Sequence, residues 1–257
     1  MIEAVLTDIE GTAGPISFVR EVLFPWARGR LRGHVAAHRQ ERAVAEILDG
    51  ARRMMGAPDA PDEEAIAALE RWSDEDRKVA PLKALQGLVW EDGYRSGELR
   101  GRLYPDVAPA LRAWSARGLR LFVFSSGSAH AQRLYFGCSE DGDLRPLFQG
   151  FFDTTTGAKV EPASYQAIAQ AIGLPPARVL FLSDTAAELD AAARAGMHAV
   201  ALAREGPAAV GPHPTARSFE EIHVGAGAPW VTGRGGAARA RELAALGRQA
   251  AARGWAL

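Results

Sequence analysis

The sequence predicts an α/β fold in which a parallel sheet is interrupted by a long helical insert. The run IEAVL at residues 2–6 is short, apolar and followed by polar residues, which is typical of a buried parallel strand. From about residue 16 to residue 96 the apolar residues keep helical spacing, with almost no strand signal. After residue 103, short apolar runs alternate with helical stretches of ten or more residues, the pattern of βαβ units.

The insert is expected to contain several helices. Ser17 is a candidate cap for the first of them, in SFVREVLFPWARGRL, and Pro61 with the acids after it is expected to open a later one. Two further segments, QERAVAEILDGARRMM and SDEDRKVAPLKALQGLVW, place apolar residues on one face of a helix. These residues are Val44, Ile47, Leu48 and Ala51 in the first segment and Val79, Leu82, Leu85 and Val89 in the second.

Strands and helices are predicted to alternate along the later part of the chain. A helix in DVAPALRAWSARG ends at Gly118 and leads into the strand LRLFVF, which delivers SSGS at residues 125–128. A helix in SAHAQRLYFG and one opened by Pro162 in PASYQAIAQAIG come next, before the strand in ARVLFLSD, which ends at Asp184. The helix AAELDAAARAGM and the strand HAVALA complete this block.

These patterns divide the chain into three parts. The first strand and the later strands share one sheet, so residues 1–15 and 101–224 are predicted to form the core. Residues 16–100 are predicted to form a helical cap that closes over the strand ends and excludes water. Residues 225–257 are a Gly/Ala/Arg-rich C-terminal tail; its arginines could bind an anionic partner, but a loosely packed helix or a mobile tail is the simpler expectation.

Composition argues against several classes of function. The 257 residues are 47% hydrophobic and 24% charged, and the net charge of −1 gives no electrostatic reason to expect nucleic acid or an anionic membrane as a partner. Cys138 is the only cysteine, which excludes an intramolecular disulfide and a cysteine-based zinc site. Neither a signal peptide nor an apolar run of about 18 to 20 residues is visible. We therefore expect a soluble cytoplasmic protein, and we separately expect it to be a monomer.

Polar side chains are expected to gather at one edge of the predicted sheet. In open parallel sheets, ligands bind outside the carboxyl ends of the strands. Three predicted strands end in polar residues, and a lysine lies just before the helix that Pro162 opens. The residues concerned are Asp8 and Glu10, Ser125 and Ser126, Ser183 and Asp184, and Lys159.

This combination of groups favours phosphoryl transfer. Carboxylate oxygens are the ligands that Mg²⁺ prefers, and Mg²⁺ also binds phosphate oxygens. Hydroxyls, the amides at helix starts and a lysine suit a phosphate dianion. Each feature alone is weak, because two acids after a strand usually form a solvated turn and a single lysine usually lies at the surface. Together they predict a site that works by positioning and charge neutralisation.

The motif D-x-[DE]-G-T on the first strand, with the later serine, lysine and aspartate, resembles the haloacid dehalogenase (HAD) superfamily of phosphatases. The chain also resembles one branch of this superfamily, the enolase-phosphatases (acireductone synthases) of methionine salvage. The segments that carry this resemblance are TDIEGT, FVREVLFPWARGRL, DEDRK, LKALQG, LYPDV, SSGS, GDLRPLFQGFFDT, GAK and FLSD. The resemblance covers roughly residues 2–224 and implies a Rossmann-like core with an inserted helical cap. One departure is Ala13, where the family usually has a second threonine.

The resemblance implies a role for each polar residue at the strand ends. Asp8 would attack phosphorus to form an aspartyl-phosphate, and Glu10 would act as general acid and then as general base. Mg²⁺ would be held by Asp8, the backbone carbonyl of Glu10 and Asp184. Lys159 would balance the phosphoryl charge and hold Asp8 in place. Phosphate or substrate oxygens would be bound by the two hydroxyls of Ser125 and Ser126.

The substrate implied by the resemblance is 2,3-diketo-5-methylthiopentyl 1-phosphate. The enzyme would first enolise it and then remove phosphate, which gives the acireductone 1,2-dihydroxy-3-keto-5-methylthiopentene. Glu10 is the first candidate for the base of the enolisation step and Asp8 the second. Alternative functions are a phosphatase of the same superfamily that acts on another small phosphoester, and a non-catalytic binding protein on the same fold. A dehalogenase is disfavoured, because its chemistry needs neither the second acid nor a metal.

Several other polar residues are given structural interpretations. Glu188, one helical turn after Asp184, could support the site or interact with the dipole of its helix. The six histidines are interpreted as surface or packing residues without metal-binding spacing, and Cys138 as an inert thiol. The aromatic residues of the insert are expected to pack within it, although one or more could line a pocket for the methylthio group.

Overall fold

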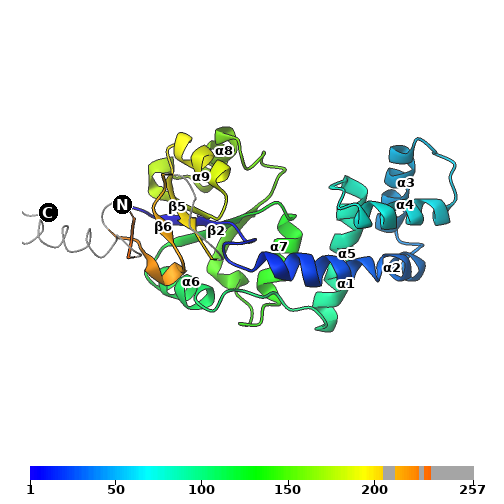
Figure 1. The fold of residues 1–257 in the computed structure, drawn as a ribbon, viewed down its shortest axis with the longest axis horizontal. Helices are drawn as coiled ribbons and strands as arrows, with labels where there is room; N and C mark the ends of the chain where they lie inside the picture. Colours follow the sequence, from blue (N-terminus) through cyan, green and yellow to red (C-terminus); the bar gives the residue numbers. More distant parts are fainter. Residues whose placement is uncertain (205–211, 226–228, 233–257) are drawn as a thin grey trace, which may run out of the picture. The chain divides into compact units, whose positions relative to one another are not determined.

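The computed structural model describes residues 1–204, 212–225 and 229–232 (Figure 1). The chain divides into two compact units. The sheet unit comprises residues 1–14, 103–129 and the chain from residue 144 onward, and the helical unit comprises residues 15–102 and 130–143. The segment 130–143 thus groups with the helical unit, although its position in the sequence suggested the core.

A parallel six-stranded sheet forms the centre of the sheet unit, with the strand order β3-β2-β1-β4-β5-β6. β1 lies between β2 and β4, and Leu6 of β1 aligns with Phe122 on one side and Phe181 on the other. The α/β fold class is therefore confirmed. The strands are β1 (Ala4–Thr7), β2 (Arg120–Phe124), β3 (Phe148–Phe152), β4 (Val179–Ser183), β5 (His198–Leu202) and β6 (Thr215–Ala216).

Helices cover both faces of this sheet: Figure 1 shows α8 (Pro162–Ile172) and α9 (Ala186–Arg194) on one side and α6 (Val107–Ala116) on the other. Every residue of β1 and of β4 is buried. Strands that are covered on both faces read as continuous apolar runs, which explains why these two were visible in the sequence. Short 3₁₀ helices occur at Arg145–Leu147, Pro176–Arg178 and Phe219–Glu221.

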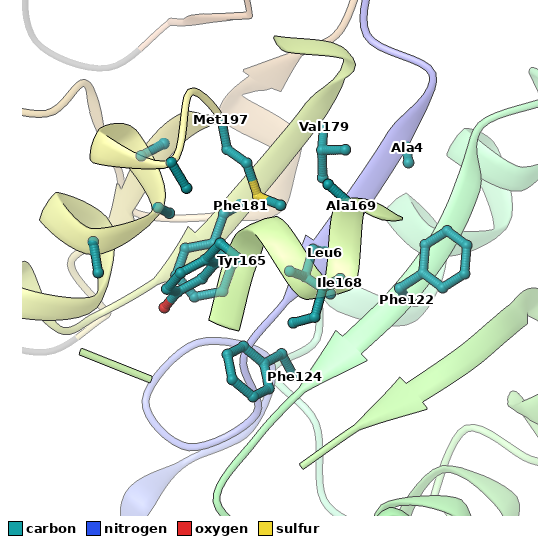
Figure 2. Close-up of a cluster of buried hydrophobic side chains, with 14 of the residues drawn as sticks. Ala4, Leu6, Phe122, Phe124, Tyr165, Ile168, Ala169, Val179, Phe181 and Met197 are labelled. Carbon is teal, nitrogen blue, oxygen red and sulfur yellow. The ribbon is translucent and has the colours of Figure 1, made fainter. Parts of the chain in front are cut away.

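The core beneath α8 and α9 is built around aromatic rings, as Figure 2 shows. Tyr165 of α8 lies edge-on to Phe124 of β2, with ring centroids 5.5 Å apart, and to Phe181 of β4, at 5.0 Å. All three residues are fully buried. Aromatic pairs in this geometry add about 0.5 to 1.5 kcal/mol each beyond the burial of their surface, so they fix α8 firmly on the sheet.

The helical unit contains helices at most of the positions where the sequence predicts them. The apolar face expected for α3 is buried, and α3 ends at Gly56 in the left-handed conformation (φ 70°). α4 follows Pro61 with three acids in its first turn, which favours a helix start. The helices are a π-helical segment (Phe18–Leu23), α1 (Phe24–Arg28), α2 (Leu31–Ala37), α3 (Arg42–Met55), α4 (Asp62–Asp74), α5 (Ala80–Ser96) and α7 (Ala129–Gly137). The first residue of α7, Ala129, belongs to the sheet unit.

Some details differ from the sequence predictions. Ser17 makes no capping hydrogen bond, because its own backbone is helical (φ −57°, ψ −38°) and does not have the extended conformation of a cap. β3 is not predicted by the sequence, because Gln149 and Gly150 interrupt its apolar run. In the predicted tail, β8 (Trp230–Val231) pairs with β7 (Ile222–His223), whereas residues 226–228 and 233–257, with the tail arginines, lie outside the described residues.

Among the residues that the structure describes, no helix combines the length and apolar character needed to cross a bilayer.

A buried ion pair ties the turn after β1 to the rest of the sheet unit. The Arg204 Nε donates to the Thr12 carbonyl oxygen at 2.9 Å, and its Nη1 donates to both carboxylate oxygens of Asp106 at 2.8 and 2.9 Å. Asp106 also accepts from the backbone N–H of Phe219 at 2.7 Å. The side chains of Arg204 and Asp106 are 5% and 14% exposed, so water screens this pair weakly.

We predict that Asp106→Ala lowers the free energy of unfolding by about 3 to 5 kcal/mol, because it leaves a buried guanidinium without its counter-charge. Urea unfolding followed by circular dichroism measures the loss. The matched control is Glu3→Ala, which removes an ion pair with Arg178 whose side chains are 40% and 51% exposed, and should cost less than about 1 kcal/mol. An equal decrease in the free energy of unfolding in the two variants would contradict the larger stabilisation assigned to the buried pair of Arg204 and Asp106.

Candidate active site

Asp8 follows β1 directly and is held in place by the sheet. Its backbone N–H donates to the Leu182 carbonyl oxygen at 2.9 Å, and the residue is only 4% exposed. The chain then makes a tight turn, in which the N–H groups of Ala13 and Gly14 both donate to the Ile9 carbonyl oxygen, at 2.9 and 2.8 Å. Gly11 has a positive φ of 71°, a conformation that glycine adopts without strain.

Glu10 lies within this turn, at the carboxyl end of β1, and is half-buried. Gly11 donates to the Gly14 carbonyl oxygen at 2.8 Å, so the turn closes on itself around Glu10. The sequence motif DIEGT therefore forms a compact loop with a fixed backbone, in which Asp8 is buried and Glu10 is more accessible.

Lys159 bridges two carboxylates at the edge of the sheet. Its Nζ lies 2.7 Å from Asp8 Oδ1 and 2.7 Å from Glu188 Oε2. The lysine is 7% exposed, and the Tyr165 hydroxyl donates to its carbonyl oxygen at 2.7 Å. Lys159 is thus a buried cation anchored by the aromatic core, and not the surface lysine that its residue type alone would suggest.

The charges of the two carboxylates keep Lys159 protonated. Burial alone would lower the pKa of its ammonium, because desolvation disfavours the charged form. The negative charges of Asp8 and Glu188 outweigh burial and raise the pKa above its ordinary value. Lys159 therefore offers a permanent positive charge at neutral pH.

Glu188 is a site residue that the sequence did not identify firmly. Its Oε2 also accepts from the Ser183 hydroxyl at 2.8 Å, and the Ser183 oxygen accepts from the Thr185 N–H at 3.1 Å. Burial, and next the charge of Asp8, raises the pKa of Glu188, while Lys159 opposes the shift. Its position one turn after Asp184 at the start of α9 was the signal available in the sequence.

Asp184 lies at the end of β4, beside β1 in the sheet, and is half-buried. Burial, and next the negative charge of Asp8, raises the pKa of the Asp184 carboxyl above its ordinary value. The two carboxylates are therefore close enough to repel each other. Oxygen ligands under mutual repulsion are the chemistry that suits a hard divalent cation.

The two serines follow β2, on the other side of β1. Ser125 is 3% exposed, and its N–H donates to the Phe152 carbonyl oxygen at 3.2 Å, whereas Ser126 is exposed. The structure thus joins Asp8, Lys159 and Glu188 by direct contact and couples Asp184 to them electrostatically. The serines and Glu10 lie at the same edge of the sheet, after β2 and β1.

Comparison with known proteins supports a hydrolase. The family model of haloacid dehalogenase-like hydrolases matches residues 2–196, which is most of the chain. A protein of Pseudomonas aeruginosa, Enolase-phosphatase E1, is 58% identical over 223 residues, which are 87% of this chain and 99% of that protein. Enolase-phosphatase E1 of Methylococcus capsulatus is 53% identical over 222 residues, 86% of this chain and 98% of that protein.

A solved structure agrees with these matches. The UTR4 protein of Saccharomyces cerevisiae is 34% identical, with a TM-score of 0.73, and the match covers 86% of this chain and 99% of that chain. Its fold and the sequence identities above confirm the resemblance on which the sequence predictions rested. The chain belongs to the haloacid dehalogenase-like hydrolases and, within them, to the enolase-phosphatases.

Proposed function

We propose that this enolase-phosphatase converts 2,3-diketo-5-methylthiopentyl 1-phosphate to the acireductone 1,2-dihydroxy-3-keto-5-methylthiopentene and phosphate, in methionine salvage. The observation that carries the proposal is the Lys159 ammonium bound between Asp8 and Glu188 at the carboxyl edge of the sheet. The identity of over 50% with relatives named Enolase-phosphatase E1 supports this substrate over other small phosphoesters. Turnover of the diketo phosphate, followed by ultraviolet absorbance and by phosphate release, tests it directly.

Asp8 is proposed as the nucleophile. The Lys159 ammonium binds Oδ1, which orients the carboxylate so that Oδ2 can attack phosphorus. The attack forms an aspartyl-phosphate and expels the enolate oxygen of the substrate, and water then releases phosphate from the enzyme. Burial of Asp8 and its hydrogen-bonded backbone keep the carboxylate in one geometry through both steps.

Glu10 is proposed as the group that moves protons. It would protonate the leaving oxygen and then deprotonate the attacking water. Aspartate occupies this position in most phosphatases of the superfamily, and glutamate carries its carboxylate about 1.5 Å further, one C–C bond. That reach would let the same acid remove a proton from the carbon that carries the phosphoester. Asp8 remains the second candidate for this enolisation base.

The residues present fit a magnesium ion. The proposed ligands are carboxylate oxygens of Asp8 and Asp184 and the backbone carbonyl of Glu10, all hard oxygen donors. The pKa of Asp184, raised by burial and by the charge of Asp8, indicates a crowded negative site that a divalent cation would relieve. When bound, Mg²⁺ would shield the repulsion between carboxylate and phosphate and acidify a chelated diketone.

The remaining polar residues are proposed to bind the phosphate group. Ser125 and Ser126 offer hydroxyl groups to phosphate or substrate oxygens, and Lys159 balances the charge on the phosphoryl group. The roles of the helical unit as a lid and of its aromatic residues in binding the methylthio group stay predictions.

We also propose that the protein acts as a monomer in the cytoplasm, without nucleic acid or membrane as a partner. The net charge of −1 argues against nucleic acid or an anionic membrane as a partner, and the single cysteine suits a reducing cytoplasm.

Asp8→Asn is expected to lower kcat/KM for phosphate release by about a thousandfold or more, because the amide keeps the shape of the side chain and loses the nucleophile. Malachite-green detection of phosphate measures the effect. Asp190→Asn is the matched control, since this acid of α9 has a 53% exposed side chain that pairs with His213 at 2.8 Å, and the variant should keep wild-type activity. Near wild-type turnover by Asp8→Asn would exclude the covalent route.

Removal of Mg²⁺ with a chelator is expected to abolish turnover, and added Mg²⁺ should restore it, because the site holds more negative charge than Lys159 balances. Metal content by elemental analysis, taken alongside activity, provides the measurement. Full activity in a preparation without detectable metal would contradict the proposed ligands.

Glu10→Asp is expected to slow enolisation of the diketo phosphate more than hydrolysis of p-nitrophenyl phosphate. A nitrophenolate leaves with little acid assistance, so its hydrolysis depends mainly on Asp8. Proton exchange at the phosphoester-bearing carbon, followed by NMR in deuterated water, reports enolisation separately from phosphate release.

Glu10→Gln is the companion variant, because it keeps the length of the side chain and removes its titratable group. It should lower both activities, by roughly a hundredfold to ten-thousandfold for the steps that need proton transfer. If Glu10→Asp instead slows the two substrates equally, glutamate has no special role in enolisation.

A further inference from the structure

The helical unit contains a cluster of two imidazoles and a carboxylate that the proposed function does not use. His34 and His38 lie one helical turn apart, the first within α2 and the second at its C-terminal end, and Asp92 lies on α5. One potential ligand atom from each residue lies within 4.8 Å of the other two. The spacing of these two histidines, i and i+4 on one helix, is visible in the sequence, where all six histidines are interpreted as surface or packing residues.

The distances within the cluster are compatible with a tetrahedral metal ion. The His34 Nδ1 is 2.7 Å from Asp92 Oδ2, and the His38 Nε2 is 4.0 Å from the same oxygen. Metal–ligand bonds of about 2.0 to 2.1 Å in a tetrahedron place the ligand atoms roughly 3.3 Å apart, between these two distances. The two imidazole rings are stacked with centroids 4.4 Å apart, as i and i+4 residues on one helical face can be.

A second carboxylate orients one of the imidazoles. The Nδ1 of His38 lies 2.6 Å from Glu41 Oε1, and a hydrogen bond from this Nδ1–H leaves the lone pair on Nε2, the nitrogen nearer to Asp92. Histidines that bind metals usually donate their other N–H to a carboxylate in this way. Glu41 thus supplies the supporting contact that a metal-binding His38 needs.

The surroundings allow an ion to enter. The three residues line a cavity of about 280 Å³. The Asp92 side chain is 50% exposed and provides access from solvent, whereas the His34 side chain is 7% exposed, and its Nε2 has no hydrogen-bond partner in the described part of the chain. Arg30 also lines the cavity, but its guanidinium is paired with Glu98 at 2.9 Å, which offsets its positive charge.

We propose that His34, His38 and Asp92 bind a divalent first-row transition metal ion, such as Zn²⁺, which links α2 to α5 within the helical unit. Two imidazoles and one carboxylate suit Zn²⁺, Ni²⁺ or Cu²⁺ better than Mg²⁺, so this site differs in metal preference from the one proposed in the sheet unit. Three protein ligands leave a fourth position for water.

The test uses the full-length protein without a polyhistidine tag, stripped of metal and then kept in excess Mg²⁺. Calorimetric titration with Zn²⁺ should show one site per chain, and Co²⁺ in its place should give visible absorption of the intensity expected for four-coordinate geometry. His38→Gln should weaken Zn²⁺ binding by at least about tenfold. Glu41→Gln, which removes no ligand, should weaken it by about tenfold to a hundredfold.

His130→Gln is the matched control. This histidine also pairs with a carboxylate on α5, Glu91, at 2.9 Å, but it belongs to no three-ligand group among the described residues. Its loss should leave the Zn²⁺ affinity unchanged. Circular dichroism checks that each variant is folded, and Asp92→Asn replaces His38→Gln if the latter is not.

Two outcomes would overturn the proposal. The first is a wild-type Kd for Zn²⁺ weaker than about 100 μM, corresponding to less than about 5.5 kcal/mol of binding. The second is equal affinity in the His38→Gln and His130→Gln variants, which would place the bound ion elsewhere. Unchanged binding after Glu41→Gln would instead contradict the orienting role assigned to Glu41, and would mean that its contact with His38 is only a surface ion pair.

Discussion

The contact of Lys159 with Asp8 and Glu188 is the interaction on which the candidate active site depends. An ammonium that is 7% exposed loses most of its hydration, a cost that only close opposite charges can offset. The two carboxylate oxygens, each 2.7 Å away, provide that compensation. Because the same contacts fix the positions of both acids, the charge of the site and its geometry are set together. A change at any one of the three residues would disturb the other two.

The position of Lys159 depends in turn on the aromatic core beneath α8. The Tyr165 hydroxyl holds the Lys159 backbone, and the Tyr165 ring packs edge-on against Phe124 and Phe181. These rings come from β2 and β4, the two neighbours of β1 in the sheet. The Lys159 Nζ itself lies 5.8 Å from the centroid of the Phe124 ring. Packing between α8 and the sheet therefore sets where the positive charge stands relative to Asp8, which links core stability to the proposed chemistry.

The parts of this structure that could be predicted are those that a short stretch of sequence encodes by its own pattern of residues. β1 and β4 are continuous apolar runs because both of their faces are covered, and Asp8 and Asp184 could be located because they follow those runs. β3 lacks such a run. Glu188 contacts Lys159 from a distant part of the sequence, and no local pattern encodes that contact. The helical spacing of His34 and His38 could be read locally, but the approach of Asp92 could not, since it depends on how α2 packs on α5.

The charge balance of the sheet unit supports the magnesium ion proposed there. Asp8, Asp184 and Glu188 bring three carboxyl groups to the site, while Lys159 brings one positive charge that Asp8 and Glu188 already share. A phosphate monoester adds about two further negative charges at neutral pH. Hydrogen bonds from serine hydroxyls can orient such a group but cannot neutralise it. The proposed Mg²⁺ would supply the additional positive charge that helps the substrate approach Asp8, and the hard oxygen donors at the ends of β1 and β4 are suited to hold it.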